Sequence, residues 1–334
     1  MENDKNSVWI SWEDHRRSRE LADSFGVQLV VLLSNKSRWI RYPLLSYKTI
    51  KYIVKRKPGL IFCQNPSIIL AAVLISSKRL FGFKLVVDRH SNFKFSLINS
   101  FNLKWVIFKF LSSWTLRCAD LTIVTNESLK EYCEAQGGKV VVLQDKIPTM
   151  SARHTLNYPD FFDANLYNIM VVATFDDDEP IEEIIDAARM LGEHYRIYVT
   201  GNYKKYFGES ERVNLIESGV FLTGFVDEYE YQNTMFFSDA VVVLTKEEFV
   251  LNCGAYEALA MRKPYVISDT ETLRGYFKKG CVYTELTAIK IANSIKYAVR
   301  NKEVLALDIE SIIPQIELEW EERFAEIERR IDLL

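Results

Sequence analysis

Short apolar runs alternate with longer amphipathic segments along the first half of the chain. Runs rich in Val, Ile and Leu that end in turn residues are typical of strands buried in a parallel sheet. They predict strands at residues 8–11, 28–33, 60–63, 85–88, 121–124 and 140–143. The segments between them predict helices at residues 16–25, 47–55, 67–80, 103–117 and 128–135. This alternation predicts an α/β fold with a doubly wound parallel sheet.

An irregular stretch at about residues 146–163 has no apolar periodicity and is the natural linker. Alternation then restarts, with strands expected at 168–173, 196–200, 220–222, 240–244 and 265–267 and helices at 181–191 and 228–237. Residues 315–334 form a charged amphipathic pattern, typical of a late helix that packs back across a domain boundary. We therefore expect two tandem Rossmann-like domains, at 1–150 and 164–334, that face a central cleft.

Composition supports a globular cytoplasmic protein. The 334 residues are 48% hydrophobic and 26% charged, which excludes a disordered chain. The five cysteines are scattered and include no Cys-x-x-Cys pair, so reduced thiols are expected rather than disulfides or a zinc site. The first seven residues are polar, unlike a signal peptide, and the longest uncharged apolar segment, 66–77, is too short to span a bilayer.

Charge is divided unevenly between the two halves. Residues 1–150 hold 23 Lys and Arg against 12 Asp and Glu, whereas residues 151–334 hold 19 against 33. Eight basic residues, interleaved with aromatics, fall between Lys36 and Lys57, and residues 101–117 repeat this mixture. Such a surface suits the inner face of an anionic cell membrane, where the protein would be peripheral. Nucleic acid is not expected, because no recognition motif accompanies it. The alternative is an aromatic helix facing the core, with solvated lysines on its other side.

The segment 245–269 carries the most specific chemistry. It follows the apolar run 240–244, begins a helix at Gly254 and Ala255, and places Glu257 in the first turn of that helix. Ligands of α/β proteins bind at the carboxyl ends of parallel strands, and the N–H groups of a helix N-terminus favour phosphate. A carboxylate would repel the phosphate itself, so Glu257 is better suited to accept hydrogen bonds from sugar hydroxyls. Phosphate and sugar together indicate a nucleotide or a sugar nucleotide; the alternative is a structural acid in the helix.

Several motifs, in this order, carry a resemblance to a known family. They occupy residues 12–22, 86–91, 119–127, 178–181, 199–205, 222–226 and 254–259. On this strand–helix framework the chain resembles GT-B glycosyltransferases of the large retaining group 1 family (family 4), in particular a bacterial subgroup used in polysaccharide assembly. The resemblance implies transfer of a hexose from a nucleotide diphosphate sugar, with retention at the anomeric carbon and without a metal ion or other cofactor.

The resemblance also implies roles for residues of the second domain. Glu257 matches the second glutamate of the family's Glu-x7-Glu motif, which holds the ribose hydroxyls of the donor. The first glutamate would stand at Phe249, and acids occur instead at Glu247 and Glu248. Glu248 is the candidate for a catalytic role, against the alternative of a solvated loop acid or a helix cap. The lysines that follow the strand at 196–200 would neutralise the donor pyrophosphate, and the residue after the strand at 220–222 would contact the nucleobase; these are Lys204, Lys205 and Val226.

In the first domain, Asp88 and His90 close a strand and should reach the cleft. Either could orient the acceptor or take its proton, although a structural histidine is the alternative. His15 and Arg16 lie at the first strand–helix junction and are candidates for contact with an acceptor phosphate. The alternative there is a helix capped by Asp14 with an exposed basic turn.

Asp176, Asp177 and Asp178 invite comparison with the metal-binding Asp-x-Asp of GT-A enzymes. They precede Glu179 and Pro180 at a helix start, where acids and proline are expected for structural reasons, so no metal site is predicted. The expected acceptor is a lipid-linked glycan at the cytoplasmic membrane face. A UDP-sugar 2-epimerase of the same fold and a non-catalytic subunit that binds sugar nucleotides are the alternatives.

Overall fold

The computed structural model describes residues 6–64, 67–90, 101–151 and 155–334. Contacts divide the chain into two compact units. Unit 1 comprises Met1–Lys146 together with Glu319–Leu334, and unit 2 comprises Ile147–Leu318. Residues 152–154 of the expected linker lie outside the described residues.

Unit 1 is built on a sheet of six parallel strands in the order β2-β1-β3-β4-β5-β6. The strands are β1 (Ser7–Ser11), β2 (Gln28–Val31), β3 (Leu60–Gln64), β4 (Lys84–Asp88), β5 (Leu121–Val124) and β6 (Val140–Val142). Its helices are α1 (Arg16–Ser24), α2 (Arg38–Arg56), α3 (Ile68–Phe81), α4 (Leu103–Cys118) and α5 (Glu127–Ala135). Each predicted strand of the first half is present within two residues of its expected ends.

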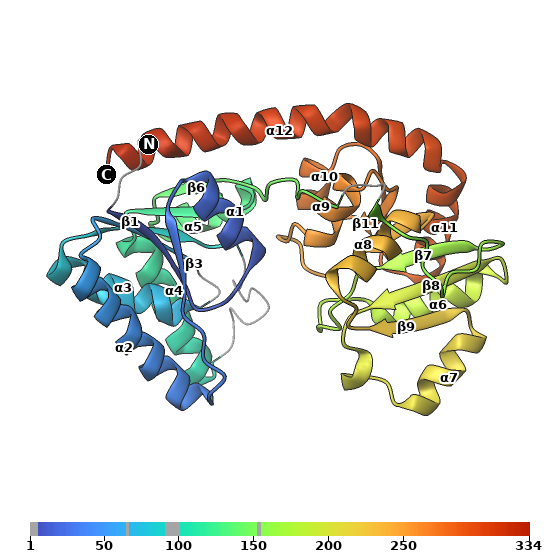
Figure 1. The fold of residues 1–334 in the computed structure, drawn as a ribbon, viewed down its shortest axis with the longest axis horizontal. Helices are drawn as coiled ribbons and strands as arrows, with labels where there is room; N and C mark the ends of the chain where they lie inside the picture. The colour runs from blue at the N-terminus through green and yellow to red at the C-terminus, as the bar shows by residue number, and fades with distance from the viewer. Residues whose placement is uncertain (1–5, 65–66, 91–100, 152–154) are drawn as a thin grey trace. The chain divides into compact units, whose positions relative to one another are not determined.

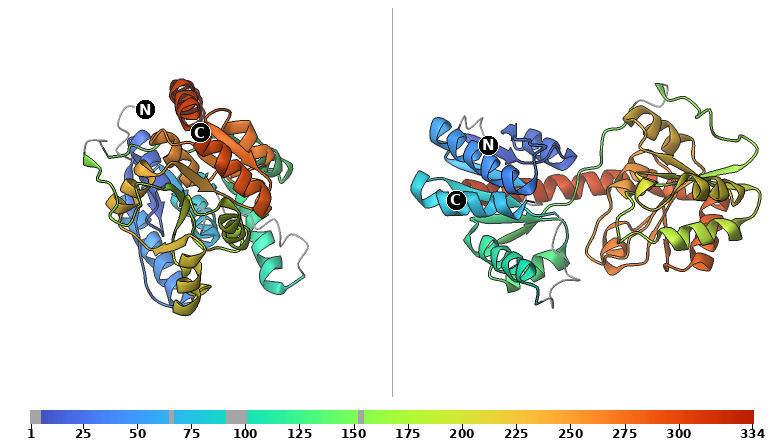
Figure 2. Two further views of the ribbon diagram at one scale, coloured as in Figure 1. Left: turned by 90° about the vertical axis from the view of Figure 1, so that its right-hand side faces the viewer. Right: turned by 90° about the horizontal axis from the view of Figure 1, so that it is seen from below.

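Helices cover both faces of this sheet (Figures 1 and 2). Because side chains alternate along a strand, Val8 and Ile10 of β1 face one core while Trp9 faces the other. Helices α2, α3 and α4 pack on the first face. On the second face, α1 packs beside the end of α12 (Lys302–Asp332).

The final turns of α12 complete the core of unit 1. Trp320 donates from Nε1 to the Gln144 carbonyl oxygen at 3.1 Å. The Phe324 ring lies 4.6 Å from that of Phe25 in α1. The last residues of the chain therefore belong to the same unit as the first strand.

Unit 2 repeats the architecture, with six parallel strands in the order β12-β11-β10-β7-β8-β9. They are β7 (Tyr167–Val171), β8 (Tyr195–Thr200), β9 (Val220–Gly224), β10 (Ala240–Val243), β11 (Tyr265–Ser268) and β12 (Cys281–Thr284). The helical elements are α6 (Ile181–Leu191), η3 (Tyr203–Lys205), α7 (Glu209–Glu217), α8 (Glu228–Phe237), α9 (Cys253–Ala260), α10 (Glu271–Tyr276) and α11 (Ala288–Arg300). The prediction of an α/β protein with two doubly wound parallel sheets is confirmed.

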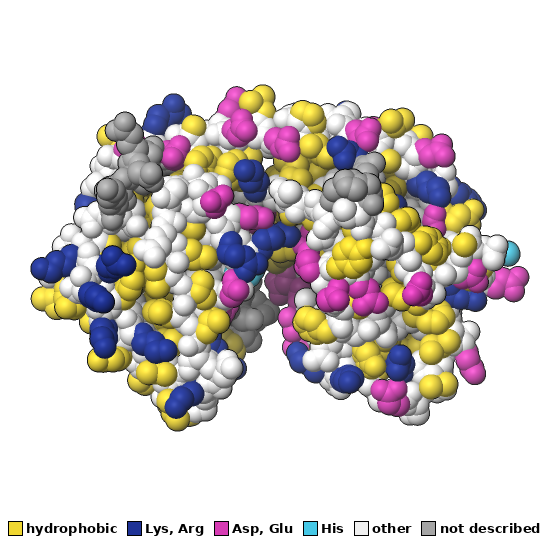
Figure 3. Space-filling model, in the orientation of Figure 1, with side chains coloured by type: hydrophobic (Ala, Val, Ile, Leu, Met, Phe, Trp, Pro, Cys, Tyr) yellow, Lys and Arg dark blue, Asp and Glu magenta, His cyan; other side chains and the backbone are white. Residues whose placement is uncertain are grey.

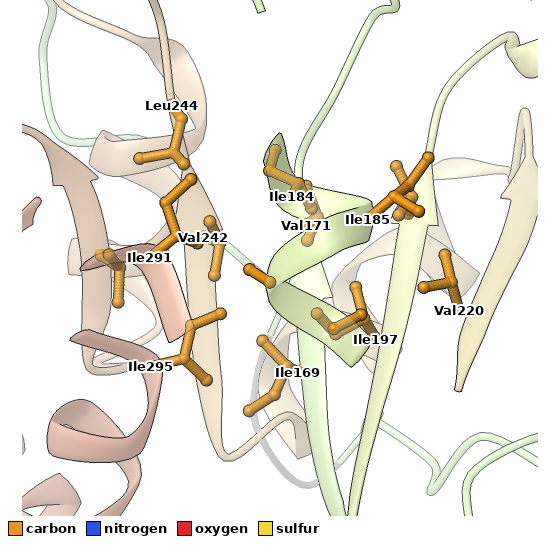
Figure 4. Close-up of a cluster of buried hydrophobic side chains, with 14 of the residues drawn as sticks. Ile169, Val171, Ile184, Ile185, Ile197, Val220, Val242, Leu244, Ile291 and Ile295 are labelled. Atoms are coloured by element: carbon orange, nitrogen blue, oxygen red, sulfur yellow. The ribbon is translucent and has the colours of Figure 1, made fainter. Parts of the chain in front are cut away.

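Two apolar layers enclose the second sheet. Figure 4 shows one of them, where side chains of β7, β8 and β10 gather with those of α6 and α11. The opposite layer joins α8, α9 and α10 with the first half of α12. The carboxyl ends of β7 and β10 are thereby held between two rigid layers.

Two helices begin earlier than their sequence patterns indicate. The predicted starts at 47 and 315 follow Pro43 and Pro314, whereas α2 begins at Arg38 and α12 at Lys302 with each proline inside the helix. A proline removes one backbone donor and kinks a helix, but burial of an amphipathic face on both sides of it outweighs that cost. Elements α7, α10, α11 and β12 were not predicted.

Candidate functional site

Unit 1 has a topological switch point at β1, because β2 lies on one side of it and β3 on the other. Ligands of open α/β sheets bind at the carboxyl ends of strands beside such a point. The side chains of Ser11, Gln64 and Asp88 lie there, and all three are buried. Ser11 donates from Oγ to Gln64 Oε1 at 2.6 Å, and Gln64 is in register with Asp88. Asp88, one of the predicted site residues, thus lies at this edge.

A buried ion cluster anchors the edge. The Arg17 guanidinium, 2% exposed, donates to Asp88 Oδ1 at 2.9 and 3.0 Å and to Asp145 Oδ1 at 2.6 Å. Burial alone would raise the pKa of Asp88, but the charges of Arg17 and His90 outweigh it and hold the pKa of Asp88 well below its usual range. Burial alone would likewise lower the pKa of Arg17, yet Asp88 and Asp145 raise it. Both groups are therefore ionised at neutral pH.

His90 is oriented by this cluster. Its Nδ1 lies 3.0 Å from Asp88 Oδ2. Because an ionised carboxylate only accepts hydrogen bonds, Nδ1 carries the hydrogen, and in the neutral ring Nε2 is then an acceptor. An imidazole held by a carboxylate in this way has the geometry of a general base. The structure thus brings together the predicted residues Asp88 and His90.

His15 joins the same group. Its ring stacks on that of His90 with centroids 5.0 Å apart. Burial and the neighbouring His90 lower the pKa of His15. His15 is also the N-cap of α1, where its Nδ1 accepts a hydrogen bond from the Arg17 N–H at 3.2 Å.

The alternative of a helix capped by Asp14 is therefore wrong, because His15 is the N-cap. Asp14 instead pairs with Arg19 on the surface. Arg16, the other predicted acceptor contact, is half-buried, and its Nε lies 3.6 Å from Glu20. The arginine that reaches the site edge is its neighbour Arg17.

Unit 2 has its switch point between β7 and β10, because β8 and β9 lie on the other side of β7. Helix α9 begins against these strands. A Cβ on Gly254 would lie 2.9 Å from Val172 Cγ1 and 3.2 Å from Val243 Cγ2. Only glycine admits such an approach, so the N–H groups that open α9 lie directly beside the strand ends. The structure places the predicted Gly254 and Ala255 at this helix start, both buried.

Glu257 lies on the same helix, one turn farther along than expected. Helix α9 starts at Cys253, which puts Glu257 in its second turn rather than its first. The Tyr231 hydroxyl of α8 donates to Glu257 Oε2 at 2.6 Å. Burial and the Glu257 charge raise the pKa of Tyr231 well above its usual value. Glu257 thus accepts a hydroxyl hydrogen bond, the bond that a sugar would offer.

Glu248 has a structural partner. Its Oε1 accepts a hydrogen bond from the Thr272 N–H at 3.0 Å, in the first turn of α10. This bond ties the β10–α9 loop to the next helix and satisfies one of the N–H groups that a helix start leaves open. A catalytic role for Glu248 stays a prediction.

The acidic run after β7 braces its own loop. Glu179 accepts hydrogen bonds from the N–H groups of Thr174 and Phe175 at 2.9 and 2.7 Å. Asp178 accepts one from the Thr245 hydroxyl at 2.8 Å, joining this loop to the end of β10. Phe175 has a left-handed φ of 60°. The hydrogen bonds from the Thr174 and Phe175 N–H groups to Glu179 stabilise this conformation. Within the described part of the chain, no cluster of three or more His, Cys, Asp or Glu is arranged to hold a metal ion.

The remaining predicted donor contacts lie at the ends of β8 and β9. Lys204 and Lys205 form the exposed turn η3, and Lys205 Nζ is 3.9 Å from Asp176. Val226 is half-buried two residues beyond β9.

A cavity of about 840 Å³ opens between the β7–α6 loop, η3 and α7. Its lining is dominated by acids, among them Asp177, Glu179 and Glu211, with Lys246 and Arg189 as its cations. A diphosphate would be repelled by this lining. The predicted phosphate site at the start of α9 is separate from this cavity, since none of the described residues of α9 lines it.

Comparison with known proteins finds similarity at the level of structure. No family model and no curated protein matches the sequence. Among solved structures, HepE from Anabaena in complex with UDP and glucose aligns with a TM-score of 0.71 and 15% identity, over 98% of this chain and 92% of that one. Sucrose-phosphate synthase from Thermosynechococcus elongatus aligns with a TM-score of 0.67 and 16% identity, over 89% and 80% of the two chains.

A third similar structure is a protein assigned as a UDP-N-acetylglucosamine 2-epimerase from Listeria monocytogenes. It aligns with a TM-score of 0.61 and 11% identity, over 98% of this chain and 97% of that one. These alignments extend over both units, so the chain has the two-domain GT-B architecture that these proteins share.

Proposed function

We propose that this chain, which has the GT-B fold, is a glycosyltransferase that moves a hexose from a nucleotide diphosphate sugar to a hydroxyl of a lipid-linked glycan. The observation that carries the proposal is the close approach of α9 to β7 and β10 at Gly254. It turns the switch point of unit 2 into an anion site with a hydroxyl-binding carboxylate, Glu257, one turn away. Structural neighbours whose complexes contain UDP and UDP-glucose support a nucleotide-sugar donor.

In the proposed reaction the acceptor oxygen attacks the anomeric carbon as the bond from that carbon to the β-phosphate oxygen breaks. The electron pair of the broken bond leaves with the nucleoside diphosphate. The N–H groups at the start of α9, with Lys204 or Lys205, stabilise the charge that develops there, and no metal ion takes part. Glu257 holds the ribose hydroxyls and Val226 contacts the nucleobase.

The acceptor side of the proposal rests on unit 1. The acceptor oxygen attacks the anomeric carbon from the same face of the sugar from which the leaving group departs, so the product retains its anomeric configuration. On that face the leaving phosphate helps to take the acceptor proton. His90, held by Asp88, orients the acceptor hydroxyl or accepts its proton. His15 and Arg16 contact a phosphate of the acceptor, which lies at the inner face of an anionic cell membrane.

A panel of nucleoside diphosphates and nucleotide sugars tests the proposal. Calorimetry identifies the donor, and turnover is then measured with and without a lipid extract. Glu257→Ala and Lys204→Ala should abolish turnover while leaving the thermal unfolding curve unchanged. Glu217→Ala, an exposed acid at the end of α7, is the matched control and should keep full activity. Full activity in both site variants would refute the site, and binding without turnover would indicate a non-catalytic subunit.

The similarity to an epimerase favours a second candidate function, a UDP-sugar 2-epimerase. Such an enzyme releases free sugar without an acceptor, whereas a transferase forms a glycoside. Proton NMR of the products separates the two activities. The same spectrum reports the anomeric configuration, and an inverted linkage would contradict retention.

A further inference from the structure

Unit 1 carries an apolar groove that is lined by none of the residues assigned above. It has a volume of about 700 Å³ and lies between the starts of α2, α3 and α4. Its walls are aromatic and aliphatic: Trp39, Tyr42, Ile69, Trp105, Phe108 and Leu111. A groove of this size and lining is typical of a site for an apolar ligand.

Large apolar side chains stand exposed around the groove. Trp39 is 90% exposed and Phe101 is 96% exposed. Leu103, Ile107 and Phe110 on α4 are 72%, 50% and 69% exposed. Exposed apolar side chains that gather on one surface mark a site of interaction, unlike single exposed ones.

The same surface is basic. Helices α2 and α4 contain nine Lys and Arg and no Asp or Glu. Arg38 and Lys104 line the groove itself. Of the cations on α2, only Arg41 has a carboxylate within 4.0 Å in the described part of the chain. Figure 3 shows basic and hydrophobic side chains interspersed over the region of α2.

An apolar groove within a basic surface favours one class of binding partner over the others. A second copy of the chain would bring two basic surfaces together, and protein interfaces are depleted in lysine. Nucleic acid would suit the charge and could stack on the aromatic rings, but it has no aliphatic group to fill the walls at Ile69 and Leu111. An anionic lipid surface satisfies both features, because lysine and arginine pair with its phosphates while aromatic and aliphatic side chains enter its apolar layer.

We infer that the groove formed by α2, α3 and α4 docks unit 1 on an anionic phospholipid bilayer, with a hydrocarbon chain of one lipid entering the groove. Arg38 and Lys104 bind lipid phosphates, and Trp39 rests at the interface. The chain would attach to one leaflet, because among the described residues no helix combines the length and apolarity needed to cross a bilayer. The inference deepens the proposed function, on which it rests for the lipid-linked acceptor, by naming the surface that meets the membrane.

Vesicle co-sedimentation tests the inference with the full chain. Vesicles of phosphatidylcholine with phosphatidylglycerol should bind it, and vesicles of phosphatidylcholine alone should bind it far less. Trp39→Ser with Ile107→Ser should weaken binding by about tenfold or more, because burial of each large apolar side chain is worth at least that factor. Leu80→Ser is the matched control, since Leu80 is 79% exposed on α3 but does not line the groove.

Charge and insertion are separated by two further measurements. Arg38→Glu with Lys104→Glu should abolish the preference for phosphatidylglycerol, whereas Lys139→Glu, exposed before β6, should not. Brominated acyl chains should quench tryptophan fluorescence, and Trp39→Phe should remove part of that quenching. Equal binding by the groove variants and the Leu80 control would overturn the inference, as would RNA binding that the same groove variants abolish while vesicle binding persists.

Failure of the docking surface can be distinguished from failure of the proposed function. The groove variants should bind nucleoside diphosphates as the unmodified chain does, because that site belongs to unit 2. Loss of vesicle binding with intact nucleotide binding supports the docking surface. If the unmodified chain binds vesicles but no nucleotide, the proposed function fails and the docking surface stands.

Discussion

Arg17 and Asp88 lie 71 residues apart in the sequence and are joined inside unit 1 by hydrogen bonds of 2.9 and 3.0 Å. The pair links the first turn of α1 to the end of β4. Asp88 also holds the imidazole of His90, so one carboxylate connects the buried cation to the residue that we propose meets the acceptor. In the proposed reaction Asp88 would act by positioning His90, and the catalytic role suggested by the sequence stays a prediction.

Asp88→Asn keeps the shape of the side chain and removes its charge. It should destabilise unit 1 by about 3 kcal/mol or more, because the buried Arg17 loses one of its two carboxylate partners. The folded state holds the pKa of Asp88 below that of the unfolded chain, which is about 4. The stabilisation is thus fully present above about pH 4 and is lost as the pH falls through the lower folded pKa.

Urea unfolding at neutral and acidic pH measures this effect. The difference between the unmodified chain and Asp88→Asn should shrink as the solution is acidified. Asp14→Asn, which breaks an ion pair on the surface, is the control and should change the free energy of unfolding by about 1 kcal/mol or less. A similar small change for Asp88→Asn would contradict the buried pair.

His15 should make the start of α1 sensitive to pH. Its Nδ1 accepts the hydrogen bond of the N-cap only when the ring is neutral, and burial beside His90 lowers its pKa. The cap therefore stabilises fully above the unfolded value of about 6.5, and this stability is lost as the pH falls through the lower folded pKa.

His15→Asn supplies a strong cap that does not titrate. In His15→Asn the start of α1 should keep the same protection against amide exchange at neutral and at mildly acidic pH. In the unmodified protein the Arg17 amide should lose protection as the pH falls. Nitrogen-15 NMR of the imidazoles reports the tautomer directly. Protonated Nδ1 in neutral His15 would rule out the cap.

Of the strands that the structure describes, the sequence located all but β12, but it did not reveal the contacts between distant residues. Apolar runs located the strands, because a strand buried on both faces has a nearly continuous hydrophobic pattern. Two helix starts were predicted too late, directly after Pro43 and Pro314, because the packing of α2 and α12 outweighs the cost of a proline inside a helix. The burial of Arg17 was not predicted, because arginine is rarely buried and only the fold reveals the two carboxylates that converge on it.

The unpredicted contacts of unit 2 have the same origin. Glu257 was recognised from its place after a strand and a small-residue helix start. Its partner Tyr231 lies on another helix, α8, with no sequence pattern that links the two. Glu179 drew attention only as part of an acidic run, while its bonds to Thr174 and Phe175 depend on the left-handed conformation of a single residue.

Gly254→Ala should separate α9 from the sheet. The added methyl group would lie 2.9 Å from Val172 Cγ1, and β-branched side chains adjust poorly. We expect a loss of about 1–3 kcal/mol in unfolding free energy together with weaker binding of nucleoside diphosphates. Calorimetry measures both quantities on one preparation.

Two further variants test whether the effect of Gly254→Ala comes from its contact with the strands. Gly275→Ala in α10 has open space around the new methyl group and should be more stable by about 0.5–1 kcal/mol. Combining Gly254→Ala with Val172→Ala removes the shortest contact, the one with Val172 Cγ1, and should restore part of the nucleotide binding. If the single variant binds nucleotides normally, the start of α9 does not form the diphosphate site.

Glu257→Gln should erase the protein's ability to distinguish a ribose from a sugar without hydroxyls. The nucleoside diphosphate that binds best should bind about tenfold or more tightly than its 2′,3′-dideoxy analogue, because a hydrogen bond to a carboxylate is worth that much. In Glu257→Gln the two affinities should converge. Tyr231→Phe removes the internal hydroxyl that Glu257 holds and leaves the carboxylate in place, so its preference for ribose should persist. Titration calorimetry of the three proteins with both nucleotides decides the matter: an undiminished preference in Glu257→Gln would show that this carboxylate does not hold the ribose, even if the chain proves to be a transferase.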